Sequence, residues 1–175
     1  MSDVRFPEGF RIERLRRDHP RRAFHSGEPA VDDWLRKNAW QNQEKRLSVT
    51  RVLLAPTGSI AGFYTLATGQ VDFGDLPADV TKHLPRRMLP VAVLAWLGVH
   101  QDHQGQGLGK RLLARALRDC HEAGQTFGFI AVVLDCVNDV AKAFYRQWDF
   151  QEVPGHPYRL FLSVGQLDAL MLRVE

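Results

Sequence analysis

The chain has 175 residues, of which 45% are hydrophobic and 25% are charged, and its formal net charge is +3. These proportions are typical of a folded globular domain with a buried core, and they argue against a disordered or fibrous chain. We therefore expect one domain over residues 1–175.

Several classes of protein are disfavoured by the sequence. No segment approaches the roughly 18 apolar residues that span a bilayer, and residues 1–10 lack the apolar centre of a signal peptide. The two cysteines, Cys120 and Cys136, match neither a metal-binding spacing nor a disulfide framework. We expect a cytoplasmic protein that needs neither membrane nor metal.

The N-terminal half predicts a strand, a helix and a hairpin. Residues 11–16 alternate weakly between apolar and charged side chains, which indicates a first strand. Pro29 is suited to the first turn of a helix, and apolar residues at helical spacing continue to Leu47. Residues 48–55 and 60–68 are rich in β-branched and apolar residues around a Pro-Thr-Gly-Ser turn, so they predict a hairpin.

The C-terminal half predicts alternating strands and helices after a covering loop. The proline-rich stretch 69–90 reads as that loop, with a short helix at 78–83. The elements expected after it are a strand at 91–100, a central helix that Gly124 ends in a left-handed cap, a strand at 129–136, a helix at 139–148 and a strand at 158–164. This order predicts a mixed α/β fold around one sheet.

A glycine-rich loop separates the strand at 91–100 from the central helix. Three glycines within Gln104–Gly109 permit a close approach of the backbone to a ligand, and the following helix start suits a phosphate. Arg111 follows Gly109-Lys110, so the loop lacks the hydroxyl of a nucleoside-triphosphate loop, and the glycine spacing is not that of a dinucleotide fingerprint. The structural alternative is an ordinary strand-to-helix turn. The loop resembles the pyrophosphate motif Gln/Arg-x-x-Gly-x-Gly of the GNAT (GCN5-related N-acetyltransferase) superfamily.

A second stretch, residues 138–150, is similar to the GNAT segment in which Asn and Ala precede Phe-Tyr. Asn138 and Tyr145 lie two helical turns apart, so both can face one cleft. Asp149 stands where the family usually has glycine, and we expect a changed helix end there. The apolar residues expected to pack on the sheet are Val140, Phe144 and Trp148.

The resemblance implies the GNAT fold, a mixed and mostly antiparallel central sheet with a splayed central strand and flanking helices. A narrower resemblance, to the GNAT toxins of type II toxin-antitoxin pairs, covers most of the chain. One departure is Trp96, which stands where those toxins commonly have arginine. The segments that carry this resemblance are 24–27, 33–35, 62–66, 76–77, 89–91, 97–99 and 104–109.

Acetyl-CoA is the co-substrate that the resemblance implies. The backbone of Leu97 and Val99 would pair with the pantetheine arm as a neighbouring strand does. Asn138 would bind the pantetheine arm or the adenylyl side. The pyrophosphate would be held by main-chain N–H groups of Gln104, Gly105, Gln106, Gly107, Gly109 and Lys110.

Tyr145 is the catalytic residue that the resemblance implies. An amine attacks the thioester, and a backbone N–H near Val99 would stabilise the oxyanion. Because a free phenol titrates near pH 10, Tyr145 is protonated at neutral pH and could donate a proton to the departing thiolate. The α-amine of an aminoacyl ester is largely neutral near pH 7, so we assign no general base.

The acceptor that the resemblance implies is aminoacyl-tRNA, whose acetylation stops translation. The arginine-rich N-terminal segment and Arg86-Arg87 could contact phosphates, although a charged run is usually only a solvated face. The expected partners are a small antitoxin of the ribbon-helix-helix type and a second copy of the chain. Two alternatives stay open: an acetyltransferase for an aminoglycoside or polyamine held by Asp72, Asp75 and Asp79, and a non-enzymatic module that binds RNA or protein.

Overall fold

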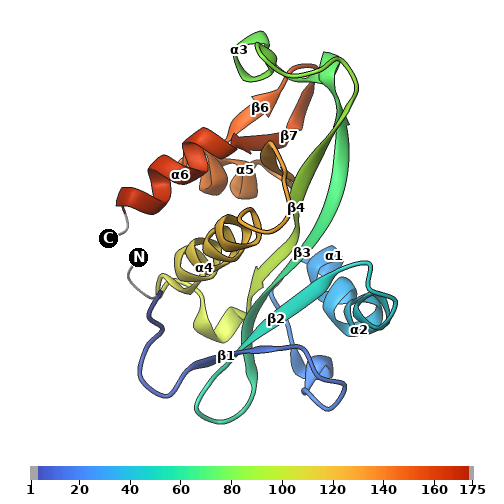
Figure 1. The fold of residues 1–175 in the computed structure, drawn as a ribbon. Coiled ribbons are helices and arrows are strands. Elements are labelled where there is room, and N and C mark those ends of the chain that lie inside the picture. Colours follow the sequence, from blue (N-terminus) through green and yellow to red (C-terminus); the bar gives the residue numbers. More distant parts are fainter. Residues whose placement is uncertain (1–3, 174–175) are drawn as a thin grey trace. The chain divides into compact units, whose positions relative to one another are not determined.

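The computed structural model describes residues 4–173. Its strands form one seven-stranded sheet in the order β1-β2-β3-β4-β5-β7-β6 (Figure 1). The elements are β1 (Arg11–Arg14), α1 (Pro29–Asp33), α2 (Ala39–Glu44), β2 (Val49–Leu54), β3 (Ile60–Asp72), α3 (Ala78–Thr81), β4 (Met88–Val99), α4 (Leu108–Ala123), β5 (Ala131–Asp135), α5 (Asp139–Arg146), β6 (Gln151–Val153), β7 (His156–Ser163) and α6 (Val164–Arg173).

The pairing of the strands confirms the predicted mixed, mostly antiparallel sheet. Four strand pairs are antiparallel: β1 with β2, β2 with β3, β5 with β7 and β6 with β7. β4 and β5 pair in parallel through two residues of β4, Ala92 and Val93. A pairing this short suits the splayed central strand that the resemblance implies.

The chain forms two compact units, each with its own hydrophobic core. The β1–β3 unit comprises residues 4–67 and 94–117, and the β5–β7 unit comprises residues 68–93 and 118–173. β3, β4 and α4 each contribute residues to both units. The single domain over residues 1–175 stays a prediction.

The β1–β3 unit has helices on its sheet because apolar residues of β2 and β3 pack against them. Val52 and Phe63 face one continuous helical run, in which a five-residue π-helix, Trp34–Asn38, joins α1 to α2. Pro29 opens this run at the first helical turn, as the sequence predicts. Gly98 allows the close packing, since a Cβ there would lie 2.6 Å from Val31 Cγ1.

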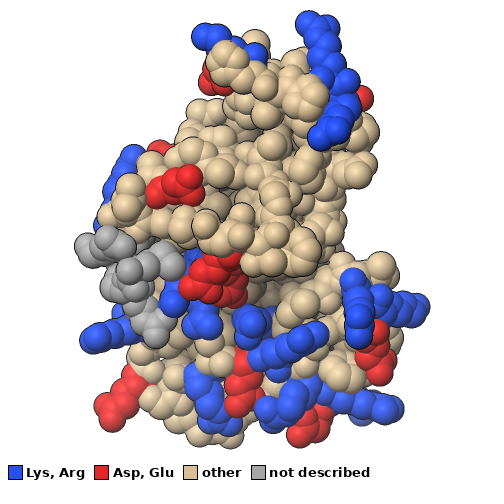
Figure 2. Space-filling model, in the orientation of Figure 1, with Lys and Arg blue, Asp and Glu red and all other residues tan. Residues whose placement is uncertain are grey.

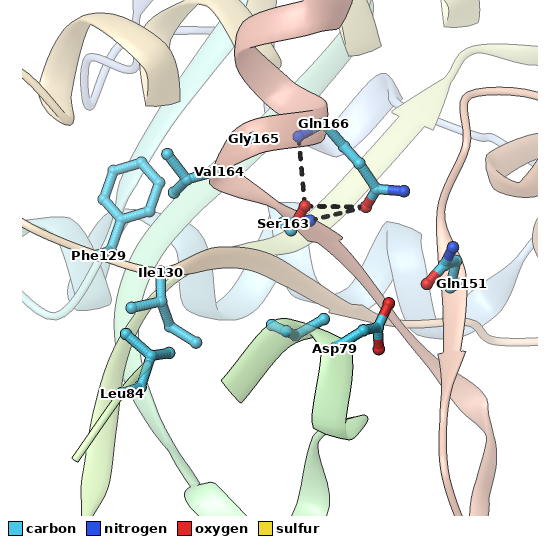
Figure 3. Close-up of a pocket in the computed structure, with 10 residues that line it drawn as sticks. Asp79, Leu84, Phe129, Ile130, Gln151, Ser163, Val164, Gly165 and Gln166 are labelled. Carbon is cyan, nitrogen blue, oxygen red and sulfur yellow. Dashed lines mark hydrogen bonds between the residues drawn. The ribbon is translucent and has the colours of Figure 1, made fainter. Parts of the chain in front are cut away.

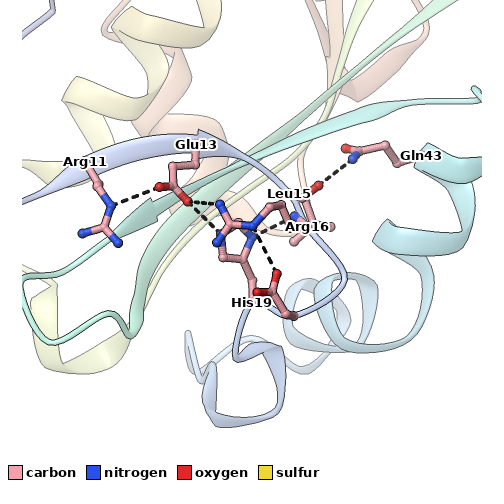
Figure 4. Close-up of polar contacts among 7 residues, drawn as sticks. Arg11, Glu13, Leu15, Arg16, His19 and Gln43 are labelled. Carbon is pink, nitrogen blue, oxygen red and sulfur yellow. Dashed lines mark hydrogen bonds and ion pairs between the residues drawn. The ribbon is translucent and has the colours of Figure 1, made fainter.

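Buried polar groups fasten the edge of the same unit (Figure 4). The Gln43 side chain donates to the Leu15 carbonyl (2.8 Å) and accepts from the Thr50 N–H (2.9 Å), which ties α2 to the chain after β1 and to β2. Glu13 lies 2.9 Å from the buried His19 ring. This hydrogen bond, with a further one from Arg11, lowers the pKa of Glu13 to about 2.

The β5–β7 unit is built on apolar residues of its strands. Val133 of β5 and Phe161 of β7 lie opposite each other in the antiparallel register and belong to one buried cluster. Leu89 at the start of β4 and Val153 of β6 belong to the same buried cluster. α6 follows β7 directly and buries Leu167, Leu170 and Met171.

Several predicted elements differ from the structure. The expected covering loop 69–90 is shorter, because β3 continues to Asp72 and β4 begins at Met88. β6 and α6 were not predicted. The start of α6 carried a signal, since Ser163 and Gln166 form a reciprocal capping box across its first turn.

Two predictions around α4 and α5 were wrong. α4 ends at Ala123, but Gly124 is not in the left-handed conformation, and a Cβ there would meet the Phe129 ring. Val140 is 81% exposed and does not pack on the sheet. The changed helix end expected at Asp149 stays a prediction; Asp149 itself adopts φ 68°, a conformation that glycine favours.

Candidate functional site

The glycine-rich loop lies between β4 and α4 in the β1–β3 unit. Gly105 and Gly107 both adopt a φ of 79°, a left-handed conformation in which glycine is strongly preferred. A Cβ built on either glycine would meet no atom within 4 Å. The glycines are therefore needed for the conformation of the backbone, and the space beside them is open to a ligand.

The start of α4 faces this loop with hydrogen-bond donors. Arg111 is the residue whose N–H bonds to the Gly107 carbonyl, at 3.3 Å. The N–H groups of Leu108, Gly109 and Lys110 precede it, and at a helix start these donors have no partner within the helix. Together with the helix dipole they suit a phosphate group.

Gln104 braces the loop with its side chain. Its Nε2 atom donates to the Val99 carbonyl (2.9 Å) and to the Ser26 carbonyl (2.7 Å). Ser26 is itself held, because its N–H donates to the buried Asp32 carboxylate at 2.8 Å. The Gln104 N–H bonds to the Gln101 carbonyl, so the phosphate donors that we assign begin after Gln104.

Leu97 and Val99 are half-buried and lie among the last three residues of β4. The Cβ position of Gly98 points at α1, so the neighbouring side chains point to the opposite face. The strand ends at Val99, and the N–H of the next residue, His100, donates to the Ala61 carbonyl at 2.8 Å. Leu97, Val99 and the loop thus form one continuous stretch of backbone.

His100 directly follows this stretch but has a structural role. Its Nδ1 accepts from the Asp102 N–H (3.1 Å), which leaves the proton on Nε2 facing the Ala23 carbonyl at 3.2 Å. Both ring nitrogens are therefore used by the backbone.

Tyr145 lies in α5, in the β5–β7 unit. It is 8% exposed, and its ring centroid lies 5.1 Å from that of Phe144 and 5.9 Å from that of Phe150. Burial, with a smaller effect of Cys136, raises the pKa of its phenol above the usual value. No described residue accepts or donates a hydrogen bond at its hydroxyl, which is unusual for a tyrosine with a structural role only.

Asn138 caps the helix that carries Tyr145. Its Oδ1 accepts from the Ala141 N–H at 2.9 Å, and its backbone is extended as in a typical N-cap. The structure thus groups Leu97, Val99 and residues 104–110 in the β1–β3 unit, and Asn138 with Tyr145 in the β5–β7 unit.

A pocket of about 520 Å³ lies within the β5–β7 unit and contains none of the residues predicted to bind acetyl-CoA or to catalyse the transfer (Figure 3). Apolar side chains of Leu84, Phe129 and Ile130 line one side, and the Ser163–Gln166 capping box closes another. Asp79 is the carboxylate on its wall, whereas Asp72 and Asp75 do not line it.

A protein-family model matches most of this chain. The model of the "Acetyltransferase (GNAT) family" matches residues 12–150. The chain belongs to the acetyltransferase (GNAT) family. It is 38% identical, over 149 residues that make up 85% of this chain and 89% of the relative, to the "tRNA-acetylating toxin" of Mycobacterium tuberculosis (strain ATCC 25618 / H37Rv).

Solved GNAT structures share the fold. AtaT complexed with acetyl-methionyl-tRNAfMet is 24% identical, with a TM-score of 0.84 over 93% of this chain and 99% of that chain. A tyrosine-to-phenylalanine mutant of AtaT, bound to the C-terminus of the antitoxin AtaR and acetyl-CoA, is 22% identical, with a TM-score of 0.77 over 94% and 99%.

Residues 4–173 show neither a membrane-spanning helix nor a cluster of metal ligands. None of the helices within this range is long and apolar enough to cross a membrane. Within the same range, no group of three or more His, Cys, Asp or Glu residues could hold a metal ion.

Proposed function

We propose that the chain transfers the acetyl group of acetyl-CoA to the α-amine of aminoacyl-tRNA and so acts as a translation-blocking toxin. Membership of the GNAT family supports the acetyl transfer, and the relative named as a tRNA-acetylating toxin supports the acceptor. The observation that carries the proposal is the open loop at Gly105 and Gly107, held left-handed at the start of α4. Such a loop fits a pyrophosphate.

The co-substrate is held mainly by the backbone. N–H groups from Gly105 to Lys110 bind the pyrophosphate, while the side chain of Gln104 keeps the loop in place. The pantetheine arm pairs with the backbone of Leu97 and Val99. Asn138 contacts the pantetheine arm or the adenylyl side.

Tyr145 supplies the proton that the reaction needs. The neutral amine attacks the thioester carbonyl carbon, a carbon–nitrogen bond forms, and a backbone N–H near Val99 stabilises the oxyanion. The carbon–sulfur bond then breaks, the ammonium loses its proton to water, and Tyr145 protonates the thiolate before regaining a proton from solvent. The raised pKa of Tyr145 keeps the phenol protonated at neutral pH.

The acceptor RNA is attracted by a basic surface on the β1–β3 unit. Figure 2 shows Lys and Arg side chains gathered over the part of the molecule that carries β1, α1 and α2 in Figure 1. Contacts to phosphates give salt-dependent binding without reading of sequence. The exposed basic residues of this segment are Arg11, Arg14, Arg16, Arg17, Arg22, Lys37, Lys45 and Arg46.

The proposed function also implies a cellular compartment and binding partners. Aminoacyl-tRNA is a substrate of the cytoplasm, and the chain works there as a single domain over residues 1–175, alone or as a homodimer. A small antitoxin of the ribbon-helix-helix type restrains it, by analogy with AtaT, whose structure includes an antitoxin C-terminus. A polyamine acceptor is less well supported, because Asp79 is the one member of the three candidate carboxylates that lines the described pocket.

The test uses the purified chain with labelled acetyl-CoA and a mixture of charged tRNAs. Acetyl label should enter the RNA and be released with the amino acid on mild alkaline treatment, together with free thiol. Thiol release with a polyamine or aminoglycoside, but not with charged tRNA, would favour the small-amine enzyme. No thiol release with any amine would favour the non-enzymatic module.

A further inference from the structure

Two tryptophans of the β1–β3 unit stack against each other. Trp34 begins the π-helical segment after α1, and Trp96 lies in β4. Their ring centroids are 5.5 Å apart and their planes differ by 12°. Both are half-buried and pack against the same hydrophobic core, so part of each indole stays accessible.

The orientation of Trp34 is fixed by buried polar groups. Its indole N–H donates to the Thr65 hydroxyl at 3.1 Å, and the Thr65 and Thr50 hydroxyls lie 2.7 Å apart. Both threonines are fully buried. Because the partner ring is held in this way, Trp96 rests on a rigid support rather than on a mobile side chain.

Trp96 itself keeps a donor for a ligand. No described residue accepts a hydrogen bond from its indole N–H, although a buried indole usually finds an acceptor. Among the described residues, two side-chain atoms are fully buried and lack a hydrogen-bond partner, Arg36 Nε and Ser48 Oγ. The Trp96 nitrogen is not one of them, so solvent or a ligand can reach it. The exposed edge of Trp96 therefore combines an apolar surface with one neutral donor.

The position of Trp96 along β4 relates it to the reacting groups. With the pyrophosphate bound after Gly105, the pantetheine arm runs back along the strand past Val99 and Leu97. In that arrangement its sulfur end would come near Trp96, which precedes Leu97 in β4. The amine that attacks the thioester must come to this same part of the strand, and its side chain with it.

We propose that the Trp34–Trp96 pair forms the wall of the acceptor site that selects the amino acid carried by the tRNA. This inference rests on the proposed function and adds the substrate class: amino acids with uncharged apolar or aromatic side chains. Such side chains gain contact with the indole surface. A carboxylate would lose water against the same apolar surface.

The experiment separates the amino acid from the RNA. One tRNA body is charged in turn with glycine, leucine, phenylalanine and glutamate, and kcat/KM for acetylation is measured for each. The unaltered chain should prefer phenylalanine and leucine to glutamate. Trp96→Ala should lower kcat/KM for phenylalanine and leucine by about tenfold and for glycine by less than about twofold, since glycine has no side chain to contact the indole.

Two further variants distinguish selection from structural damage. Trp96→Arg should reverse the ranking in favour of glutamate, a gain that loss of packing cannot produce. Trp40→Ala removes another half-buried tryptophan from the same core and should leave the ranking unchanged. Acetyl-CoA affinity and thermal unfolding, measured for every variant, should show a folded chain with an intact co-substrate site.

Three results would contradict selection of the amino acid by the Trp34–Trp96 pair. A uniform loss across all four amino acids, or an unchanged ranking in both Trp96→Ala and Trp96→Arg, would overturn the selection by the tryptophan pair. An equal change of ranking in Trp40→Ala would do the same. If the unaltered chain acetylates none of the charged tRNAs, the proposed function itself fails and the inference fails with it.

Discussion

Gln104 holds Ser26, with its side-chain nitrogen 2.7 Å from the Ser26 carbonyl oxygen, although 77 residues separate the two in the chain. The same nitrogen also donates to the Val99 carbonyl at 2.9 Å. The loop that we assign to the pyrophosphate is therefore tied both to the end of β4 and to the segment before α1. A glutamine at this position serves the site by positioning the backbone.

Replacing this brace should weaken co-substrate binding. Gln104→Ala removes two hydrogen bonds, each worth about 1 kcal/mol, so we expect a loss of acetyl-CoA affinity of at least about tenfold. Gln106→Ala is the matched control, because the Gln106 side chain is exposed and its N–H is retained. Calorimetric titration measures both. Equal affinities for the two variants would remove the bracing role from Gln104.

Substitution of Gly107 should abolish co-substrate binding. Gly107→Asp forces a side chain into a left-handed conformation and adds a negative charge where the pyrophosphate is expected. Gly58→Ala provides a control for backbone strain, since Gly58 has φ 86° and no atom within 4 Å of a Cβ. The control should lower stability and leave acetyl-CoA affinity unchanged. Tight binding by Gly107→Asp would contradict the phosphate assignment.

Tyr145→Phe should separate catalysis from binding. The phenylalanine keeps the packing against Phe144 and Phe150 and removes the proton donor, so we expect turnover to fall by about 100-fold or more. Acetyl-CoA affinity and thermal stability should change little, because no described residue bonds the hydroxyl. Steady-state kinetics with charged tRNA measures the effect, and undiminished turnover would exclude Tyr145 as the acid.

The turn after α5 should tolerate asparagine and reject β-branched residues at Asp149. With φ at 68°, Asp149→Val should reduce the free energy of unfolding by about 1–2 kcal/mol. Asp149→Asn should stay within about 0.5 kcal/mol, because the ion pair to Arg173 is exposed and long at 3.5 Å. Urea denaturation compares the two. A Val variant as stable as the Asn variant would argue against left-handed backbone here.

The network around Glu13 should make stability depend on acid pH. The pKa of Glu13 falls from 4.5 to about 2 on folding, mainly through the hydrogen bond with His19. The stability gained from the ionised form is thus fully present above pH 4.5 and is lost as the pH falls toward 2. Glu13→Gln should flatten this part of the profile of unfolding free energy, whereas Glu44→Gln should not. Parallel profiles for Glu13→Gln and the unaltered chain would count against the network.

Much of the fold could be predicted because its signals are local. The apolar spacing of α4 and the β-branched runs of β2 and β4 depend on residues that are neighbours in sequence. The loop 69–90 was misjudged because its prolines suggested irregular backbone, while the strand character of its two ends depends on pairing within the sheet. α6 was missed although the Ser163–Gln166 capping box was present in the sequence.

The sequence alone determined the glycine loop, the helix start behind it and the spacing of Asn138 and Tyr145, because each depends on backbone conformation over a few residues. Only the tertiary structure decided the stacking of Trp34 on Trp96, the brace from Gln104 to Ser26 and the burial of the Tyr145 phenol. These relationships join side chains from elements far apart in the chain. Their geometry is set by how those elements pack, and no local pattern of residues records it.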